Sequence, residues 1–163
     1  MYIHKMNDFT ILRETENLDL ESKMLMEKAI EALPTAYAPY SKFRVATALL
    51  LDDGNVVTGT NQENAAYPAG MCAERVALFT VASQHPGKKI VKLLVLAKLD
   101  GESEIAPASS CGPCRQVMLE FEERQGQPIE IVMQSQDHLW VRATSAASLL
   151  PFCFSNRSLK AKK

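Results

Sequence analysis

Three segments of the chain place apolar residues at helical spacing. Residues 18–36 carry them every three or four positions and reach Pro34, where a helix is expected to end. The segments CAERVALFTVASQ and CGPCRQVMLEFEERQG predict two further helices. In the last of them, Gly126 stands where a residue in the left-handed conformation commonly follows a helix C-terminus.

Five other segments have the composition and length of β-strands. FRVATALLL and VVTGTN flank Asp53-Gly54-Asn55 and predict a hairpin with those residues as the turn. IVKLLVLAKL, IEIVMQS and LWVRA predict three more strands, and SAASLLPFCF predicts a short terminal helix or turn. The order α-β-β-α-β-α-β-β-α predicts an α/β fold in which one mixed five-stranded sheet lies in a three-layer α/β/α arrangement.

Length and composition indicate one domain. The 163 residues are 47% hydrophobic, which suits a single unit over residues 1–163 with a short basic C-terminal tail at about 159–163. The net charge is −1, so neither nucleic acid nor an anionic membrane is expected as a partner.

The chain also has no segment that suggests insertion into a membrane or secretion. No run approaches ~18 consecutive apolar residues, and the acidic, polar start lacks the apolar core of a secretory signal. We therefore expect a cytoplasmic protein. Its four cysteines are then better suited to metal binding or catalysis than to disulfides.

The segment SSCGPCRQV has two chemical interpretations. Cys-Gly-Pro-Cys at the start of a helix is the redox motif of thioredoxin-like proteins, and it can equally supply two zinc ligands. The redox interpretation fits poorly, because Ser110 replaces the usual aromatic residue before Cys111 and three predicted strands precede the motif. The cis-proline that such proteins need has Pro151 as its candidate, in the terminal turn. A third possibility is that Cys111 and Cys114 are simply buried apolar residues.

A third zinc ligand is available in the segment MCAER. Cys72 opens a predicted helix, as Cys111 and Cys114 open another, and a helix N-terminus stabilises the thiolate that a metal requires. A catalytic zinc site has three protein ligands and an open position. Glu74 lies two residues beyond Cys72, where a proton shuttle would stand. Cys-x-Glu followed by Cys-x-x-Cys is the signature of zinc deaminases, and none of the three histidines falls in either motif.

These motifs occur within a longer resemblance. The segments AYAPYSKFRVATALL, GTNQENAAYPAGMCAERVALF, SSCGPCRQVMLEF and LLPFCF resemble the homotetrameric cytidine deaminases over most of the chain after residue 35. The resemblance implies zinc-dependent hydrolysis of cytidine and 2′-deoxycytidine to the uridines and ammonia, with one Zn²⁺ per chain. It also implies a small-molecule nucleoside substrate and a homotetramer.

The resemblance assigns roles to residues around the zinc ligands Cys72, Cys111 and Cys114. Glu74 is the implied proton shuttle between water and N3 of the pyrimidine. Arg75 matches an arginine that hydrogen-bonds the sulfur ligands and offsets their negative charge. The implied sugar-binding pair is Asn61 and Glu63, which we expect to face the same side because they alternate along a strand.

The remaining implied contacts concern the base and a neighbouring subunit. Phe43 and Ala73 are expected at the substrate, with the Phe43 ring against the pyrimidine. Tyr67 is expected to reach the sugar in a neighbouring subunit. Phe154, near the chain's end, is expected to stack on the base of a neighbouring subunit and so complete its site.

The chain departs from the family pattern at four positions. Ser110 replaces the usual proline, while Pro113 stands inside the cysteine pair. Ala46 replaces a glycine and is expected to add a methyl group near the pocket, and Thr47 adds a hydroxyl. Three alternatives remain open: deamination of another base or of blasticidin, a zinc-binding module without turnover, and a dithiol oxidoreductase.

Overall fold

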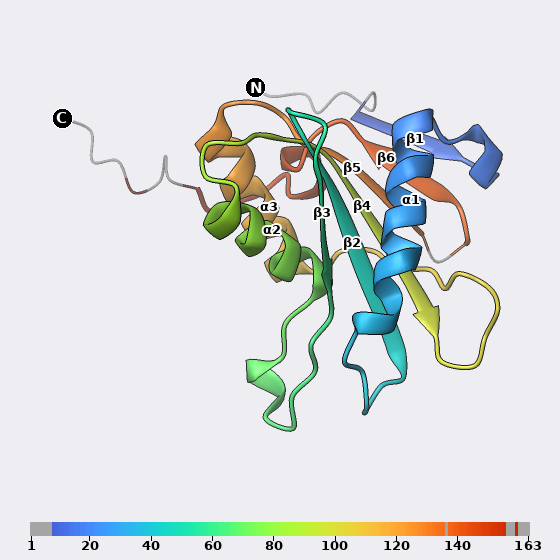
Figure 1. Cartoon of the computed structure of the whole chain (residues 1–163). Coiled ribbons are helices and arrows are strands. Elements are labelled where there is room, and N and C mark those ends of the chain that lie inside the picture. Colours follow the sequence, from blue (N-terminus) through green and yellow to red (C-terminus); the bar gives the residue numbers. More distant parts are fainter. Residues whose placement is uncertain (1–7, 136, 156–158, 160–163) are drawn as a thin grey trace.

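Among the residues that the structure describes, six strands form one sheet with three α-helices on its two faces (Figure 1). The structure is a computed structural model that describes residues 8–135, 137–155 and 159. The strands are β1 (Phe9–Leu12), β2 (Phe43–Leu51), β3 (Val56–Thr60), β4 (Ile90–Leu99), β5 (Glu130–Gln134) and β6 (Trp140–Ala143). The helices are α1 (Leu20–Ala32), α2 (Ala73–Gln84) and α3 (Gly112–Gln125). The three main helices and five strands expected from the sequence are confirmed.

The strand order β1-β6-β5-β4-β2-β3 determines where the helices begin. Strands β3 and β4 are both antiparallel to β2, so they run in the same direction. Helix α2 follows β3, and α3 follows β4. Both helices therefore start at the same end of the sheet, although 39 residues separate their first cysteines, Cys72 and Cys111.

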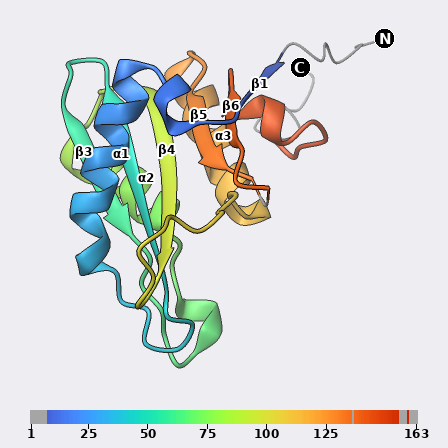
Figure 2. The same cartoon turned by 90° about the vertical axis from the view of Figure 1, so that its right-hand side faces the viewer.

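The sheet has one strand more than the sequence predicted. Strand β1 pairs with β6 in antiparallel register, Phe9 opposite Ala143 and Leu12 opposite Trp140 (Figure 2). It is only four residues long and half-exposed, so its own periodicity is a weak signal. Pairing with β6 stabilises it, and Trp140 adds a hydrogen bond from Nε1 to Thr15 Oγ1 at 3.2 Å.

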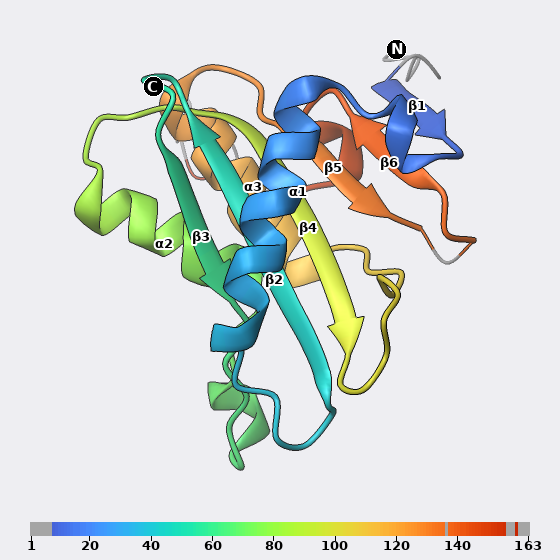
Figure 3. The same cartoon turned by 45° about the vertical axis from the view of Figure 1, so that its right-hand side comes forward.

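The two faces of the sheet carry separate hydrophobic cores. Leu50 and Leu94 pack beneath α1, while Leu49 and Leu93 pack beneath α2 and α3, as the alternation along a strand requires. Figure 3 shows α1 in front of the sheet with α2 and α3 behind it. Because both faces are covered, β2 and β4 are apolar at almost every position rather than alternating.

Helix α2 lies unusually close to β3 at Gly59. A Cβ atom at this position would lie 2.4 Å from the Ala77 nitrogen and 2.7 Å from the Ala73 carbonyl oxygen. Only glycine allows this approach, because both neighbours are backbone atoms. The contact sets the height of the first turn of α2 above the sheet.

The chain's two ends differ in how far they can be described. The predicted terminal helix or turn is a 3-10 helix at Ala147–Leu149. Of the predicted basic tail at about 159–163, only Leu159 belongs to the described residues. Among the described helices, none combines the length and the apolar character needed to cross a membrane.

Candidate metal centre and active-site cavity

Three cysteines meet where α2 and α3 begin. Cys72 is the N-cap of α2 and Cys111 the N-cap of α3, and neither side chain caps its own helix. Cys114 lies in the first turn of α3 and is buried. The Sγ atoms of Cys72 and Cys111 are 3.8 Å apart, those of Cys111 and Cys114 are 3.3 Å apart, and all three lie within 4.8 Å of one another.

This arrangement fits a zinc ion. Zn–S bonds of about 2.3 Å in a tetrahedron place neighbouring sulfurs about 3.8 Å apart, which is the Cys72–Cys111 separation. Three thiols leave one tetrahedral position for water or substrate, as in catalytic rather than structural zinc sites. Both helix N-termini favour the thiolate form of the ligands.

The electrostatics of the cluster already favour a thiolate. The pKa of Cys72 is lowered to about 5, first by its hydrogen bond with the Cys114 thiol and then by Arg75, against an opposing effect of burial. The same hydrogen bond and burial raise the pKa of Cys114. Arg75 donates from Nη2 to Cys72 Sγ at 3.6 Å, so its guanidinium lies against one of the three sulfurs.

Glu74 lies beside the cluster and is almost entirely buried, with 4% of its surface exposed. It nevertheless lines the cavity that reaches Cys72 and Cys111. Burial raises the pKa of this carboxyl above its ordinary value, and the negative charge of Cys72 adds to the effect. A carboxyl whose pKa is raised is a weaker acid and a stronger base, which suits a group that must accept and then donate a proton.

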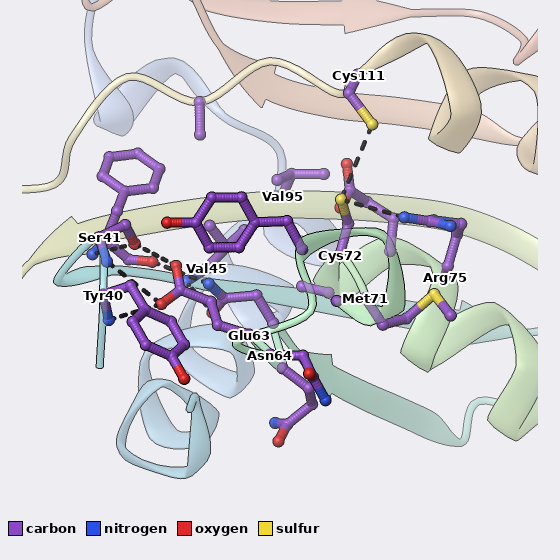
Figure 4. A pocket seen from close by; sticks show the side chains of 18 of the residues that line it. Tyr40, Ser41, Val45, Glu63, Asn64, Met71, Cys72, Arg75, Val95 and Cys111 are labelled. Carbon is purple, nitrogen blue, oxygen red and sulfur yellow. Dashed lines mark hydrogen bonds between the residues drawn. The ribbon is translucent and has the colours of Figure 1, made fainter. Parts of the chain in front are cut away.

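The cavity measures about 850 Å³ and runs from the cysteines to the loop before β2 (Figure 4). Its walls come from the start of β2, the segment after β3, the first turn of α2 and the segment before α3. Phe43, Tyr67 and Ala73, all predicted to contact substrate, line it.

Asn61 and Glu63 also line the cavity, and Figure 4 shows Glu63 away from the cysteines, beside Tyr40 and Ser41. Strand β3 ends one residue before Asn61, and the two residues nevertheless line the same cavity. The Asn61 amide accepts from the Val45 nitrogen and donates to the Phe43 carbonyl, both at 2.9 Å. Asn61 is therefore fixed against the first residues of β2.

Glu63 is held by residues that the sequence interpretation did not single out. Its carboxylate accepts hydrogen bonds from the Tyr40 nitrogen at 3.0 Å and from both the nitrogen and the hydroxyl of Ser41. The hydrogen bond from the Ser41 hydroxyl, as the largest effect, lowers the pKa of Glu63 below its ordinary value. Tyr40 and Ser41 also line the cavity, and the Tyr40 and Tyr67 rings meet edge to face at 6.4 Å. Their position just before Phe43 in the segment APYSKF was the available signal.

The structure places three residues named in the sequence analysis outside the cavity of their own chain: Ala46, Thr47 and Phe154. Ala46 lies in the core beneath α1, on the opposite face of the sheet, so the expectation of a methyl group near the pocket was wrong. Thr47 is fully buried and does not line the cavity either. Phe154 does not line it, and 62% of its surface is exposed.

An α/β fold with a three-thiol metal centre and a buried carboxyl at the floor of a cavity defines a class of zinc hydrolases, and comparison with known proteins gives the family. The family model "Cytidine and deoxycytidylate deaminase zinc-binding region" matches residues 20–126. The cytidine deaminase of Sporosarcina psychrophila is 40% identical over 146 residues, which cover 90% of this chain and 95% of that protein. This chain belongs to the cytidine and deoxycytidylate deaminase family.

Two further similarities agree with this assignment. The cytidine deaminase of Halalkalibacterium halodurans is 45% identical over 102 residues, 63% of this chain and 73% of that protein. The crystal structure of cytidine deaminase from Burkholderia pseudomallei matches with a TM-score of 0.65 and 38% identity, covering 81% of this chain and 98% of that one.

Proposed function

We propose that this chain hydrolyses cytidine and 2′-deoxycytidine to uridine and 2′-deoxyuridine, with release of ammonia. The observation that carries the proposal is a buried carboxyl, Glu74, directly beside the Cys72–Cys111–Cys114 cluster at the floor of an open cavity. Family membership supports the same chemistry.

The three cysteines hold the zinc ion, one per chain. When bound, zinc acts as a Lewis acid and lowers the pKa of a coordinated water. Three thiolates would weaken that acidity by donating charge to the metal. Arg75 counters this, because its guanidinium hydrogen-bonds Cys72 and withdraws charge from the sulfur.

Glu74 moves the protons of the reaction. Its carboxylate takes a proton from the attacking water and gives it to N3 of the pyrimidine, which makes C4 electrophilic. The water oxygen forms the new bond to C4. The hydroxyl now on C4 then gives its proton through Glu74 to the exocyclic nitrogen, so that the C4–N4 bond breaks, ammonia leaves and the C4 carbonyl of the uracil remains. The raised pKa of Glu74 suits a group that both accepts and donates.

Asn61 and Glu63 bind the 3′-hydroxyl of the sugar. The Asn61 amide bonds the backbone at the start of β2, and the Glu63 carboxylate bonds the backbone just before that strand. Both groups retain further hydrogen-bonding sites for the sugar. A contact to the 3′-hydroxyl alone admits both cytidine and deoxycytidine.

The charge of the cavity favours nucleosides over nucleotides. Among the described residues that line it, Arg75 is the single cation, and that side chain is engaged with Cys72. Glu63 and Glu74 contribute carboxyl groups. A 5′-phosphate would therefore enter a cavity without a free cation, so we expect deoxycytidylate to be a poor substrate.

A second copy of the chain completes the site. Phe43 lines the cavity, whereas Phe154 is exposed and does not line the cavity of its own chain. We propose a homotetramer in which Phe154 stacks on the base bound by a neighbouring subunit, with Tyr67, 78% exposed, near its sugar. Truncation before Pro151 should raise KM for cytidine strongly and leave zinc content unchanged. A fully active monomer would contradict the shared site.

We propose that residues 1–163 form one domain and that the protein acts in the cytoplasm, where the ligand thiols stay reduced. A panel of nucleosides, deoxynucleotides, free bases and blasticidin, followed by ultraviolet absorbance, tests the substrate. Cytidine and deoxycytidine should be turned over fastest. Faster turnover of guanine, blasticidin or deoxycytidylate would replace the proposed substrate with that compound, and no turnover at all by the zinc-loaded chain would contradict an enzymatic function.

A further inference from the structure

Arg115 connects two segments of the chain. One is the zinc-binding loop, which leads through Ser110 into Cys111, and the other is the C-terminal segment, residues 149–155. Arg115 lies in α3, one position after the ligand Cys114. Its Nε donates to the Ser110 carbonyl oxygen at 2.9 Å, and its Nη1 donates to the Leu149 carbonyl oxygen at 3.3 Å. The Ser110 carbonyl belongs to the peptide group that leads directly into Cys111. One guanidinium therefore holds two chain segments that are 39 residues apart.

Gln116, the next residue along α3, holds the same C-terminal segment further on. Its Nε2 donates to the Phe154 carbonyl oxygen at 2.7 Å. The side chains of Phe152 and Phe154 remain exposed, at 95% and 62%. The segment is therefore fixed through its backbone while its aromatic side chains stay free to contact another molecule.

These bonds are suited to orienting a side chain. Residues 150–155 contain no helix or strand that could fix the backbone from within. None of the ion pairs among the described residues involves Arg115, so its planar, charged fork is committed to the two carbonyls. Hydrogen bonds from a charged donor are stronger than those between neutral groups.

We propose that Arg115 and Gln116, here called the C-terminal clamp, are positioning residues that hold Phe154 in place for the active site of a second copy. The proposal rests on the shared site of the proposed function and adds the residues that orient it. The clamp therefore links two active sites. Within one subunit it joins that subunit's own zinc-binding loop to Phe154, which stacks in the site of a neighbouring subunit. The Gln116 amide bonds the Phe154 carbonyl, whereas Arg115 bonds the Leu149 carbonyl and also the Ser110 carbonyl beside the zinc ligands. Substitutions of Gln116 therefore test the hold on the C-terminal segment without removing a bond to Ser110.

Three substitutions of Gln116 test the clamp. Gln116→Met has similar length and no donor, Gln116→Glu replaces the donor with an acceptor, and Gln116→Lys keeps a donor. We expect Met and Glu to raise KM for cytidine about tenfold through a poorly placed stacking ring, while Lys stays close to the original KM. Zinc content and kcat at saturation should not change. Glu120→Met, an exposed site one turn further along α3, is the control.

Unchanged KM in Gln116→Met and Gln116→Glu would overturn the clamp, and so would equal losses in the Met and Lys variants. A fall in kcat with lost zinc would show that Gln116 acts on its own subunit, which also contradicts the proposal.

Mixed tetramers separate action within a subunit from action between subunits. Refolded mixtures of Gln116→Met with Glu74→Gln should regain a population of sites with the original KM. In those sites the first subunit supplies Glu74 and the second supplies a well-placed Phe154. Mixtures that show only the raised KM would contradict the proposal.

A measurement without substrate tests the C-terminal clamp independently of the proposed deaminase activity. Limited chymotrypsin digestion should cleave after Phe152 or Phe154 faster in Gln116→Met than in Gln116→Lys, because the unclamped backbone fits a protease more readily. If the unaltered protein deaminated no substrate, the proposed function would be wrong, but the digestion would still test the C-terminal clamp. Equal cleavage rates in the two variants would contradict the clamp.

Discussion

The Sγ atoms of Cys72 and Cys111 lie 3.8 Å apart, and each cysteine is the N-cap of a different helix. The strands before these helices run in the same direction, so both helices begin at one end of the sheet. The metal centre thus follows from the topology of the fold. A change that moves either helix start should affect the metal before it affects the rest of the protein.

Replacing the ligands should remove the metal. Cys72→Ala and Cys111→Ala should each lose zinc and deaminase activity together, and Cys114→Ala should in addition lower stability because Cys114 is buried in the core. Metal analysis of the purified variants measures this. Cys153→Ala is the matched control, since Cys153 is exposed and lies outside the cluster, and it should keep both zinc and activity. Full activity of a chelator-treated, metal-free sample would contradict the account.

Gly59 is not a metal ligand, but we expect a substitution there to affect both the stability of the protein and zinc binding. Gly59→Ala places a methyl group 2.4 Å from backbone of α2, so the helix start must shift. We expect a loss of about 2 kcal/mol in the free energy of unfolding, together with weaker zinc binding. Gly112→Ala provides the control for urea unfolding, because a Cβ there meets nothing within 4 Å. Equal stability of the two variants would show that α2 adjusts freely.

Arg75 should affect the metal through sulfur rather than through direct coordination. Arg75→Gln removes the cation that hydrogen-bonds Cys72 and should lower turnover and zinc affinity about tenfold or more. Arg124→Gln, which removes a cation from the opposite end of α3, is the comparison. If both variants behaved alike, Arg75 would contribute only surface charge.

A buried lysine beneath α1 predicts how stability depends on pH. Lys92 lies 2.9 Å from Asp19 and 3.0 Å from both Glu21 and Glu130. Burial alone would raise the pKa of Asp19, but its hydrogen bonds from Lys92 and Ser22 lower it to about 2. A lowered pKa in the folded state means that the stabilisation is present above about pH 4 and is lost as the pH falls toward 2.

The corresponding measurement is the free energy of unfolding between pH 5 and 2. The unaltered protein should lose more stability over this range than Asp19→Asn, which lacks the titrating group. Lys92→Met should cost about 2 kcal/mol at pH 7, less than a fully buried pair because the carboxylates are partly exposed. Parallel pH curves for the unaltered protein and Asp19→Asn would rule out this contribution.

The sequence predicted the metal centre better than it predicted the cavity walls. Cys72, Cys111 and Cys114 could be found because their spacing marks two helix starts, which is local information. The hydrogen bonds of Glu63 to Tyr40 and Ser41 join residues more than twenty positions apart, and no periodicity reveals them. Such contacts depend on where the loop before β2 folds over the sheet.

Two differences from the expected fold have the same physical origin. Strand β1 depends on a partner, β6, that lies more than 120 residues away in the sequence. Ala46 was expected near the pocket from its position in the family pattern, yet its neighbour Val45 lines the cavity and adjacent residues of a strand face opposite sides. Pairing and facing are properties of the assembled sheet, so short or isolated segments do not predict them.

The role of Glu74 is the central claim, and one comparison tests it most directly. Cytidine turnover and zinc content should be measured side by side for the unaltered protein and for Glu74→Gln, which preserves shape and removes the proton-transferring carboxyl. The account predicts one zinc per chain in both proteins and a fall in kcat of at least about a hundredfold in the variant. A zinc-loaded Glu74→Gln that kept a tenth of the original rate would contradict it.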